Sequence, residues 1–353
     1  MLLYIVLAIL LFGLLLVAHE TGHFLAAKSV GIRVNEFSIF LGPAIWQRTK
    51  GETTYSLRCI PFGAYCAMEG ENGDSDDPRS FTAAKPLHRL LVLIAGSAAN
   101  FLLGFLILVL LYSFQAGIAT PRISGFYEGS TVPQETGLQI GDTLHSIDGE
   151  RVYLYNDVAI LLSRNPTGVY DLTVRRDGAL VALDDVPLTL REYTVNGETV
   201  TKYGVVFSVD KTTAPRVIAA AWHNALDFAR LVRLSLQDLI HGLVGVGDLS
   251  GPIGIVSAMA QSGTAAKTTS GGVMNVAYFA SFLAVNLAVM NMLPLPALDG
   301  GRVFFLLVTW AAETVLRRKI DPKYESFIHA AGLLLLLAFL AFITLKDILR
   351  LIG

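Results

Sequence analysis

The N-terminal stretch of this chain constrains its fold more than any other part of the sequence. Residues Leu2 to Ala18 contain no charged side chain, and Phe24 to Ala27 continue the apolar run. A helix needs about 20 such residues to cross a bilayer. No Lys or Arg precedes the run, and His19, Glu20 and His23 stand where a signal peptide would have small neutral residues. We therefore expect a retained transmembrane helix.

Three later segments have the same apolar character. We predict spans over residues 2–27, 89–117, 274–296 and 328–349, whereas Val303 to Trp310 is too short to cross and is expected to continue as a helix at the membrane face. Charged residues make up 16% of the chain, well below the roughly 25% of soluble proteins. The net charge of −2 argues against a general nucleic-acid partner. The composition predicts a multi-pass α-helical membrane protein.

Basic residues in short loops predict the orientation of the spans. They are concentrated after the first span and between the third and fourth spans, at Lys28, Arg33, Arg48, Lys50, Arg58, Arg79, Lys85 and Arg89, and at Arg302, Arg317, Arg318, Lys319 and Lys323. We expect both loops to face the cytoplasm, with the N-terminus and the long middle region outside.

The first of these loops has the alternation of β-strands. Residues 34–39, closed by Gly42-Pro43, and 53–60 predict a short membrane-associated hairpin. Its edge near Phe37 to Gly42 would hold an extended peptide by β-addition, or the hairpin is a plain surface feature. Glu69 to Asp77 is acidic and is expected to be a mobile linker. Cys59 and Cys66 are interpreted as free thiols.

Residues 120–208 have a soluble composition and a strand–turn rhythm. Arg176-Asp177-Gly178-Ala179 predicts a hairpin turn between 172–174 and 180–182, after a glycine-bracketed strand within 136–149. This pattern resembles a PDZ domain; a β-rich spacer without a ligand is the alternative. Residues 214–245 predict a helix with a mixed face. The expected divisions are 1–119 with the first two spans, 120–210 with the PDZ-like domain, 211–272 with an amphipathic helix and linker, and 273–353 with the last two spans.

The end of the first span contains the motif H-E-x-x-H. His19 and His23 are four residues apart, so on a helix both imidazoles lie on one face and reach one metal ion. Glu20 flanks the same position as a candidate base. Zinc held by two histidines and a carboxylate keeps a fourth position for water.

A third ligand has few candidates among the apolar segments, because an acid at membrane depth is costly and is a functional candidate by default. Asp347 is interpreted as an interfacial anchor and Glu313 as part of a solvated helix face. Asp299 follows Pro294 and Pro296, which stop a regular helix directly after an apolar span. Its alternative role is structural, as a helix cap acting through Arg302.

These features together resemble the site-2 proteases, intramembrane zinc metalloproteases of the bacterial regulator-of-sigma-E-protease type. The resemblance rests on H-E-x-x-H, the PDZ-like insertion, Leu249-Ser250-Gly251-Pro252 and Asn291 to Gly301 in that order. It implies that His19, His23 and Asp299 bind Zn2+ and that Glu20 is the catalytic base. It also implies substrate-binding roles for Asn291 and Asn100. Ser97 replaces a usual proline, and Phe40-Leu41-Gly42 keeps one of two usual glycines.

The resemblance implies cleavage of transmembrane segments of single-pass membrane proteins, as in regulated intramembrane proteolysis of anti-sigma factors or removal of signal-peptide remnants. The expected location is the bacterial plasma (inner) membrane, with the active site towards the cytoplasm and the PDZ-like domain outside. The PDZ-like groove would bind a peptide or protein tail, or the domain would exclude substrates by size. A membrane zinc carrier or sensor and a tethered, water-facing metalloprotease are the competing interpretations.

Overall fold

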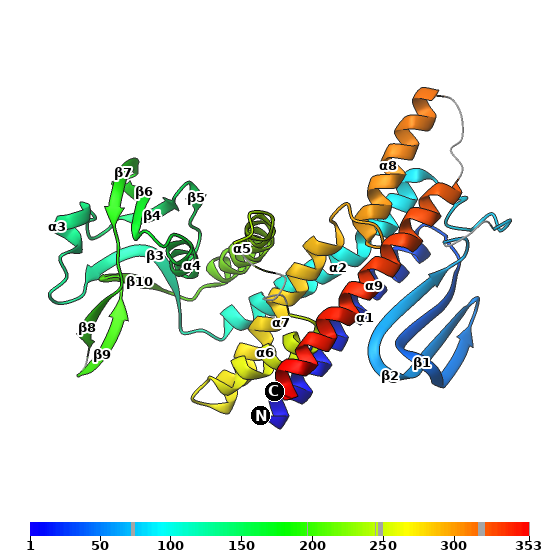
Figure 1. The fold of residues 1–353 in the computed structure, drawn as a ribbon, viewed down its shortest axis with the longest axis horizontal. Helices are drawn as coiled ribbons and strands as arrows, with labels where there is room; N and C mark the ends of the chain where they lie inside the picture. The colour runs from blue at the N-terminus through cyan, green and yellow to red at the C-terminus, as the bar shows by residue number, and fades with distance from the viewer. Residues whose placement is uncertain (72–74, 196, 244, 246–249, 317–321, 353) are drawn as a thin grey trace. The chain divides into compact units, whose positions relative to one another are not determined.

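The computed structural model describes residues 1–353 except 72–74, 196, 244, 246–249, 317–321 and 353. The chain forms two compact units. The first comprises Met1–Leu108 and Phe228–Gly353, and the second comprises Val109–Asp227. Figure 1 labels the elements of both units. Leu249, Arg317, Arg318 and Lys319, which entered the sequence predictions, lie outside the described residues.

The first unit is mainly helical. Its long helices are α1 (Leu2–Ser29), α2 (Pro86–Ser113), α5 (Ala214–Ile240), which runs across the boundary between the units, α6 (Pro252–Thr264), α7 (Thr269–Asn291), α8 (Asp299–Leu316) and α9 (Pro322–Ile352). Within the part of the chain that the structure describes, four segments are long and apolar enough to cross a membrane: α1, α2, α7 and Phe327–Leu349 of α9. The chain is therefore a multi-pass membrane protein with four candidate spans, as predicted.

Two predicted span boundaries need correction. The second span ends at Ser113 rather than at residue 117, because Gly117 already begins a strand. The third span begins at Thr269 and ends at Asn291. It cannot continue to residue 296, since Pro294 and Pro296 lack the backbone N–H that a helix interior needs.

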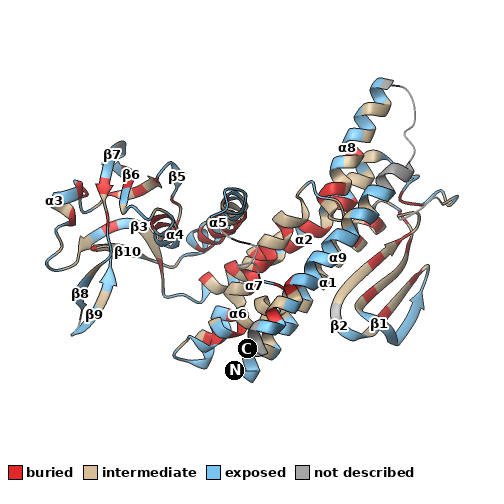
Figure 2. Ribbon diagram, in the orientation of Figure 1, coloured by how far each residue is buried: buried red, intermediate tan, exposed pale blue. Residues whose placement is uncertain are grey.

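Small residues allow the spans to pack closely. A Cβ on Gly104 of α2 would lie 3.0 Å from Ala284 of α7, and Ala280 and Ala284 are fully buried. Tyr4 of α1 packs against Gly263 and Gly272 at the facing ends of α6 and α7. Close approach through small side chains is the usual way in which helices associate in lipid. By contrast, α9 is mostly exposed along its length, as Figure 2 shows.

The strands β1 (Val34–Lys50) and β2 (Thr53–Met68) are longer than predicted. The chain does not stop at Gly42-Pro43 but bends there, where Phe40 and Gly42 have φ angles of 70° and 85°. Residues 36–39 pair with 64–67 on one side and with 54–57 on the other. Segment 34–39 therefore lies in the interior of the folded hairpin. Among the described residues, segments 44–50 and 64–68 are its edges, because each is paired on one side only.

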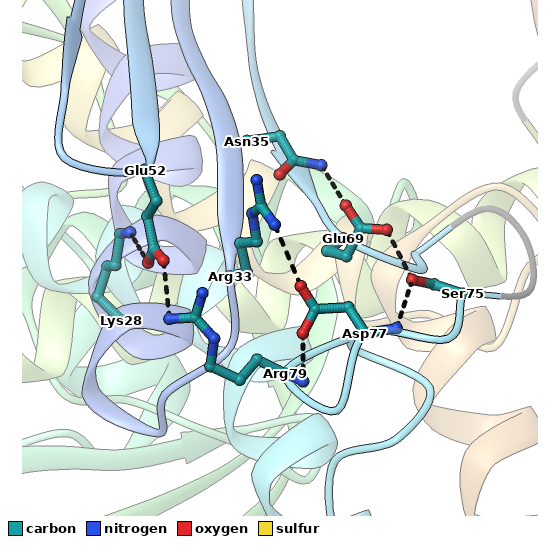
Figure 3. Close-up of polar contacts among 8 residues, drawn as sticks. All are labelled: Lys28, Arg33, Asn35, Glu52, Glu69, Ser75, Asp77 and Arg79. Atoms are coloured by element: carbon teal, nitrogen blue, oxygen red, sulfur yellow. Dashed lines mark hydrogen bonds and ion pairs between the residues drawn. The ribbon is translucent and has the colours of Figure 1, made fainter.

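The predicted mobile linker, Glu69 to Asp77, is tied into a polar network at the base of the hairpin. Glu69 accepts hydrogen bonds from Asn35 (2.7 Å) and Ser75 (2.6 Å), and Asp77 pairs with Arg33 at 3.2 Å. Figure 3 shows this network beside Glu52, which pairs with Lys28 of α1. The described part of the segment is therefore ordered by its acidic side chains, and the prediction was wrong for it.

The second unit is built around a mixed α/β core. Its sheet has the strand order β10–β3–β4–β6–β7, with β5 paired to β4 and a separate pair β8–β9. The strands are β3 (Gly117–Phe126), β4 (Thr143–Ile147), β5 (Glu150–Arg151), β6 (Val169–Arg176), β7 (Ala179–Pro187), β8 (Arg191–Val195), β9 (Glu198–Lys202) and β10 (Val205–Lys211), with helices α3 (Val132–Thr136) and α4 (Tyr155–Arg164).

The predicted hairpin turn is confirmed. Arg176 pairs with Ala179 across Asp177 and Gly178, whose φ angles are 49° and 85°. Two positive φ angles match the twist of the flanking strands. The core beneath the sheet includes Val174 and Leu172 of β6 together with Leu161 and Leu162 of α4. The sequence thus contains an inserted β-rich unit with its own core.

Candidate active site

The two histidines of the first span lie on one face of α1, as the four-residue spacing predicts. Their Nε2 atoms are 3.2 Å apart, and their rings meet edge to face. His23 is buried, and His19 is partly buried. Both nitrogens therefore point at one place beside the helix.

The ring orientation of His23 is set by the neighbouring span. Its Nδ1 lies 2.8 Å from the carbonyl oxygen of Val92 in α2. A carbonyl only accepts, so Nδ1 carries the proton and donates it, which leaves the Nε2 lone pair free. Such a bond fixes the tautomer and orientation of a metal-binding histidine.

Two glycines allow α1 and α2 to approach at this point. A Cβ on Gly22 would lie 2.3 Å from the carbonyl oxygen of Ala95, and a Cβ on Gly96 would lie 2.4 Å from Nε2 of His23. Real Cβ atoms cannot make contacts this short. Any larger residue at Gly96 would therefore displace the imidazole of His23.

Asp299 is supplied by α8, about 280 residues after the histidines. The chain leaves α7 at Asn291, turns through residues 292–298, and starts α8 with Asp299. Gly300 and Gly301 fit against the backbone of this turn, where a Cβ would lie 2.3 Å from Met292 and 2.2 Å from Leu295. Oδ2 of Asp299 lies 3.2 Å from Nε2 of His19 and 3.3 Å from Nε2 of His23.

The three atoms form a nearly equilateral triangle that fits one zinc ion. Ligand atoms about 2.0–2.1 Å from a tetrahedral ion are about 3.3–3.4 Å from one another, close to the 3.2, 3.2 and 3.3 Å seen here. Oδ2 of Asp299 is buried and accepts no hydrogen bond among the described residues. A buried carboxylate oxygen that faces two imidazole nitrogens, one of them with its lone pair free, is suited to a cation. Two nitrogens and one carboxylate oxygen form a donor set typical of zinc.

The remaining predicted residues differ in their burial and in their contacts. Glu20 lies within electrostatic reach of His19, His23 and Asp299. Asn100 is 1% exposed in α2, and its Oδ1 has no partner among the described residues. Asn291 is half-buried at the last position of α7. Arg302 forms an ion pair with Glu71.

The folded hairpin approaches the site through β2. Burial, together with the negative charges of Glu20 and Glu71, raises the pKa of the Cys66 thiol to about 12. Cys66, and with it segment 64–68, therefore lies within electrostatic reach of Glu20. Cys66 is therefore an inert, protonated thiol at neutral pH, and Cys59 is free and exposed.

Sequence reasoning did not find three contributors to the site. The Val92 carbonyl leaves no signal in sequence, since any residue supplies one. Gly96 had a usable signal, because it stands in a run of small residues within an apolar span. The Arg302–Glu71 ion pair joins residues 231 positions apart, and no local pattern connects them.

Four spanning helices and a His–His–Asp triangle beside a glutamate define a membrane-embedded metalloprotease architecture. Comparison with known proteins gives the family. The model of peptidase family M50 matches residues 7–339. A protein of Clostridium perfringens named as a zinc metalloprotease is 33% identical, with 98% of each chain covered. The regulator of sigma-W protease RasP of Bacillus subtilis is 27% identical, with 97% of each chain covered.

The chain belongs to peptidase family M50, the site-2 protease family. It is a metalloendopeptidase, and Zn2+ is its expected cofactor. This confirms the resemblance drawn from the sequence and disfavours the zinc-carrier interpretation.

Proposed function

We propose that this protein cleaves single-pass membrane proteins within or near their transmembrane segments, as part of regulated intramembrane proteolysis. His19, His23 and Asp299 hold Zn2+, and Glu20 is the catalytic base. The observation that carries this proposal is the triangle of ligand atoms, with edges of 3.2–3.3 Å, on a helix that is apolar enough to span a membrane.

The residues of the chain divide the chemistry between them. Zinc, when bound, supplies the Lewis acidity that makes a water molecule available as a nucleophile near neutral pH. Glu20 takes a proton from that water and returns it to the amine that leaves. The Val92 carbonyl keeps His23 in the tautomer that binds metal.

The substrate has to be extended before it can be cut, because a helix hides its carbonyl groups in hydrogen bonds. The sequence favoured residues 37–42 as the docking strand, but 36–39 are paired on both sides. We assign docking instead to the 64–68 segment, which is the edge near Glu20. Asn291 at the end of α7 would donate a hydrogen bond to the substrate backbone. The buried position of Asn100 suits it better to supporting α2 beside Gly96.

Glu20→Gln tests the mechanism. The substitution removes the base and keeps the shape, so zinc content should stay at the wild-type level while cleavage falls about 10²–10⁴-fold. The measurement is cleavage of a membrane-embedded reporter in vesicles, with zinc determined on the same samples. Glu52→Gln is the matched control, because Glu52 pairs with Lys28 away from the site. Cleavage by Glu20→Gln at the wild-type rate would overturn the mechanism.

We further propose that the second unit is a PDZ-like filter that admits substrates already trimmed outside the membrane. Its sheet, with α4 beneath it and the β6–β7 hairpin, supports this assignment. Deletion of residues 120–208 should allow cleavage of an untrimmed reporter. Addition of a free C-terminal peptide to the intact protein separates the two modes: inhibition indicates tail binding, and unchanged cleavage indicates exclusion by size.

The proposed location is the bacterial inner membrane, with the active site towards the cytoplasm and the second unit outside. The basic residues after α1 support this orientation, as do those before α9. Reporter enzymes that are active only outside the cytoplasm test it. A fusion after Lys50 should be inactive, and a fusion after Lys202 should be active; the reverse result would invert the topology.

A further inference from the structure

The turn that presents Asp299 contains a residue in an uncommon backbone conformation. Ala297 has a φ angle of 74°, in the left-handed region that residues with a Cβ rarely adopt. It stands two residues before Asp299 in the sequence. Any rotation at Ala297 would therefore move the carboxylate away from the histidines, so the neighbouring structure has to hold this conformation.

One side of the turn is held by α9. The backbone N–H of Ala297 donates a hydrogen bond to Nδ1 of His329 at 3.2 Å. Gly332 lies one turn further along α9, on the same face. A Cβ there would be 2.3 Å from the Cβ of Pro296. Two positions of α9 thus contact two consecutive residues of the turn.

The imidazole of His329 is also held from α8. Its ring meets the ring of Phe305 edge to face, with centroids 5.3 Å apart. Because Nδ1 accepts the bond from Ala297, the ring proton is on Nε2. That Nε2 is buried and has no hydrogen-bond partner among the described residues.

An unpartnered buried N–H opposes folding. A leucine would fill the same surroundings without that cost. The benefit of histidine at this position therefore lies in the bond that Nδ1 accepts. That bond supports the left-handed conformation of Ala297 and, through it, the place of Asp299.

We infer that His329 is a positioning residue of the active site, and that α9 is part of the scaffold that holds Asp299 in addition to being a membrane span. The inference rests on the proposed function, because it takes Asp299 as a ligand. The hydrogen bond that His329 accepts comes from the backbone N–H of Ala297. It acts on the backbone two residues before the ligand.

His329→Leu and His329→Asn test the inference in the full-length protein. Leucine removes the acceptor, whereas the Oδ1 atom of asparagine replaces Nδ1 at nearly the same distance from the backbone. For His329→Leu we expect zinc release to a chelator to be about 10-fold faster and kcat to be about 10-fold lower, with KM unchanged, as for residues that orient metal ligands. The visible absorption bands of the Co2+-substituted protein should also shift. His329→Asn should restore all of these values to within about twofold of wild type.

Three comparisons make the result decisive. Phe327→Leu, at a 75% exposed position of α9, should behave as wild type. Gly332→Ala keeps the imidazole but displaces Pro296, so it should also release zinc faster, and it serves if His329→Leu does not fold. Normal zinc release in either His329→Leu or Gly332→Ala would overturn the inference, as would a His329→Asn variant as impaired as His329→Leu.

Asp299→Ala separates failure of this inference from failure of the proposed function. If Asp299→Ala keeps its zinc, the ligand set is wrong and the role of His329 falls with it. If Asp299→Ala loses zinc while His329→Leu releases it at the normal rate, only the inference about His329 is wrong.

Discussion

Asp299 and Asp347 both belong to helices of the membrane-spanning unit, but their carboxylates face different groups. Asp347 accepts hydrogen bonds from backbone N–H groups, whereas Asp299 faces two imidazole nitrogens. Asp347, on α9, is 5% exposed, and its Oδ2 accepts hydrogen bonds from the backbone N–H groups of Gly251 and Gly254, each at 2.9 Å. These groups belong to the N-terminal turn of α6. The positive end of a helix dipole stabilises a carboxylate at this place.

Asp299 has no such donors for its inward oxygen. Its Oδ2 faces two imidazole nitrogens, one of which is already committed as a lone-pair donor by the Val92 contact. One carboxylate is therefore satisfied by the protein alone and joins two helices. The other faces two imidazole nitrogens at distances that suit a shared cation. The interpretation of Asp347 as an interfacial anchor was wrong, because the side chain is buried and bonded to α6.

The largest effect is expected for Asp299→Ala. Loss of one of three protein ligands should weaken zinc binding by more than about 100-fold, beyond what loss of a supporting residue does, and should reduce cleavage to background. Zinc content after dialysis and reporter cleavage are the measurements. Asp347→Ala is the matched control and should keep its zinc. If both variants lose zinc equally, the distinction between the two aspartates fails.

The second effect concerns stability, and here Asp347 is expected to matter through its contact with α6. Asp347→Ala leaves two buried N–H groups without an acceptor, so we expect it to lower the free energy of unfolding by about 2–4 kcal/mol. Thermal unfolding in detergent, together with hydrogen exchange in residues 251–256, measures this. Leu345→Ala, at a 57% exposed position two residues before Asp347, controls for changes on α9. An Asp347→Ala variant as stable as the control would show that the contact with α6 contributes nothing.

Asp142 of the second unit extends the comparison to a carboxylate outside the spanning helices. Asp142 receives two bonds of 2.8 Å from the Arg176 guanidinium and one of 2.9 Å from the N–H of Gln139. Burial raises the pKa of Asp142, but these bonds outweigh burial and hold its pKa below the ordinary value. Because the folded pKa is depressed, the stabilisation is complete above the unfolded pKa of about 3.9 and is lost as the pH falls through the folded pKa.

Asp142→Asn should lower the stability of the second unit by about 1.5–3 kcal/mol at pH 7 and abolish this loss below about pH 4. The measurement is amide protection of residues 137–147 between pH 3 and pH 7, corrected for the intrinsic exchange rate. An unchanged acid dependence in the variant would assign the effect to another group.

The membrane part of the fold was predictable because its signals are local. Runs without charge predict helices, since a bilayer offers no other partner for the backbone. Pro294 and Pro296 show that the third span stops before them, although its predicted end at residue 296 lay five residues past Asn291. The hairpin was harder, because β1 and β2 pair with each other twice, and alternation along one strand does not reveal that 36–39 has neighbours on both sides.

The sequence by itself determined which residues share a face. His19 and His23 lie together because a helix repeats every 3.6 residues, and this needs no information from elsewhere in the chain. Only the tertiary structure decided that Oδ2 of Asp299 completes their triangle, that the Val92 carbonyl sets the tautomer of His23, and that His329 holds the turn before Asp299. These contacts join segments up to about 280 residues apart. Their geometry depends on how whole helices pack, and no local periodicity encodes it.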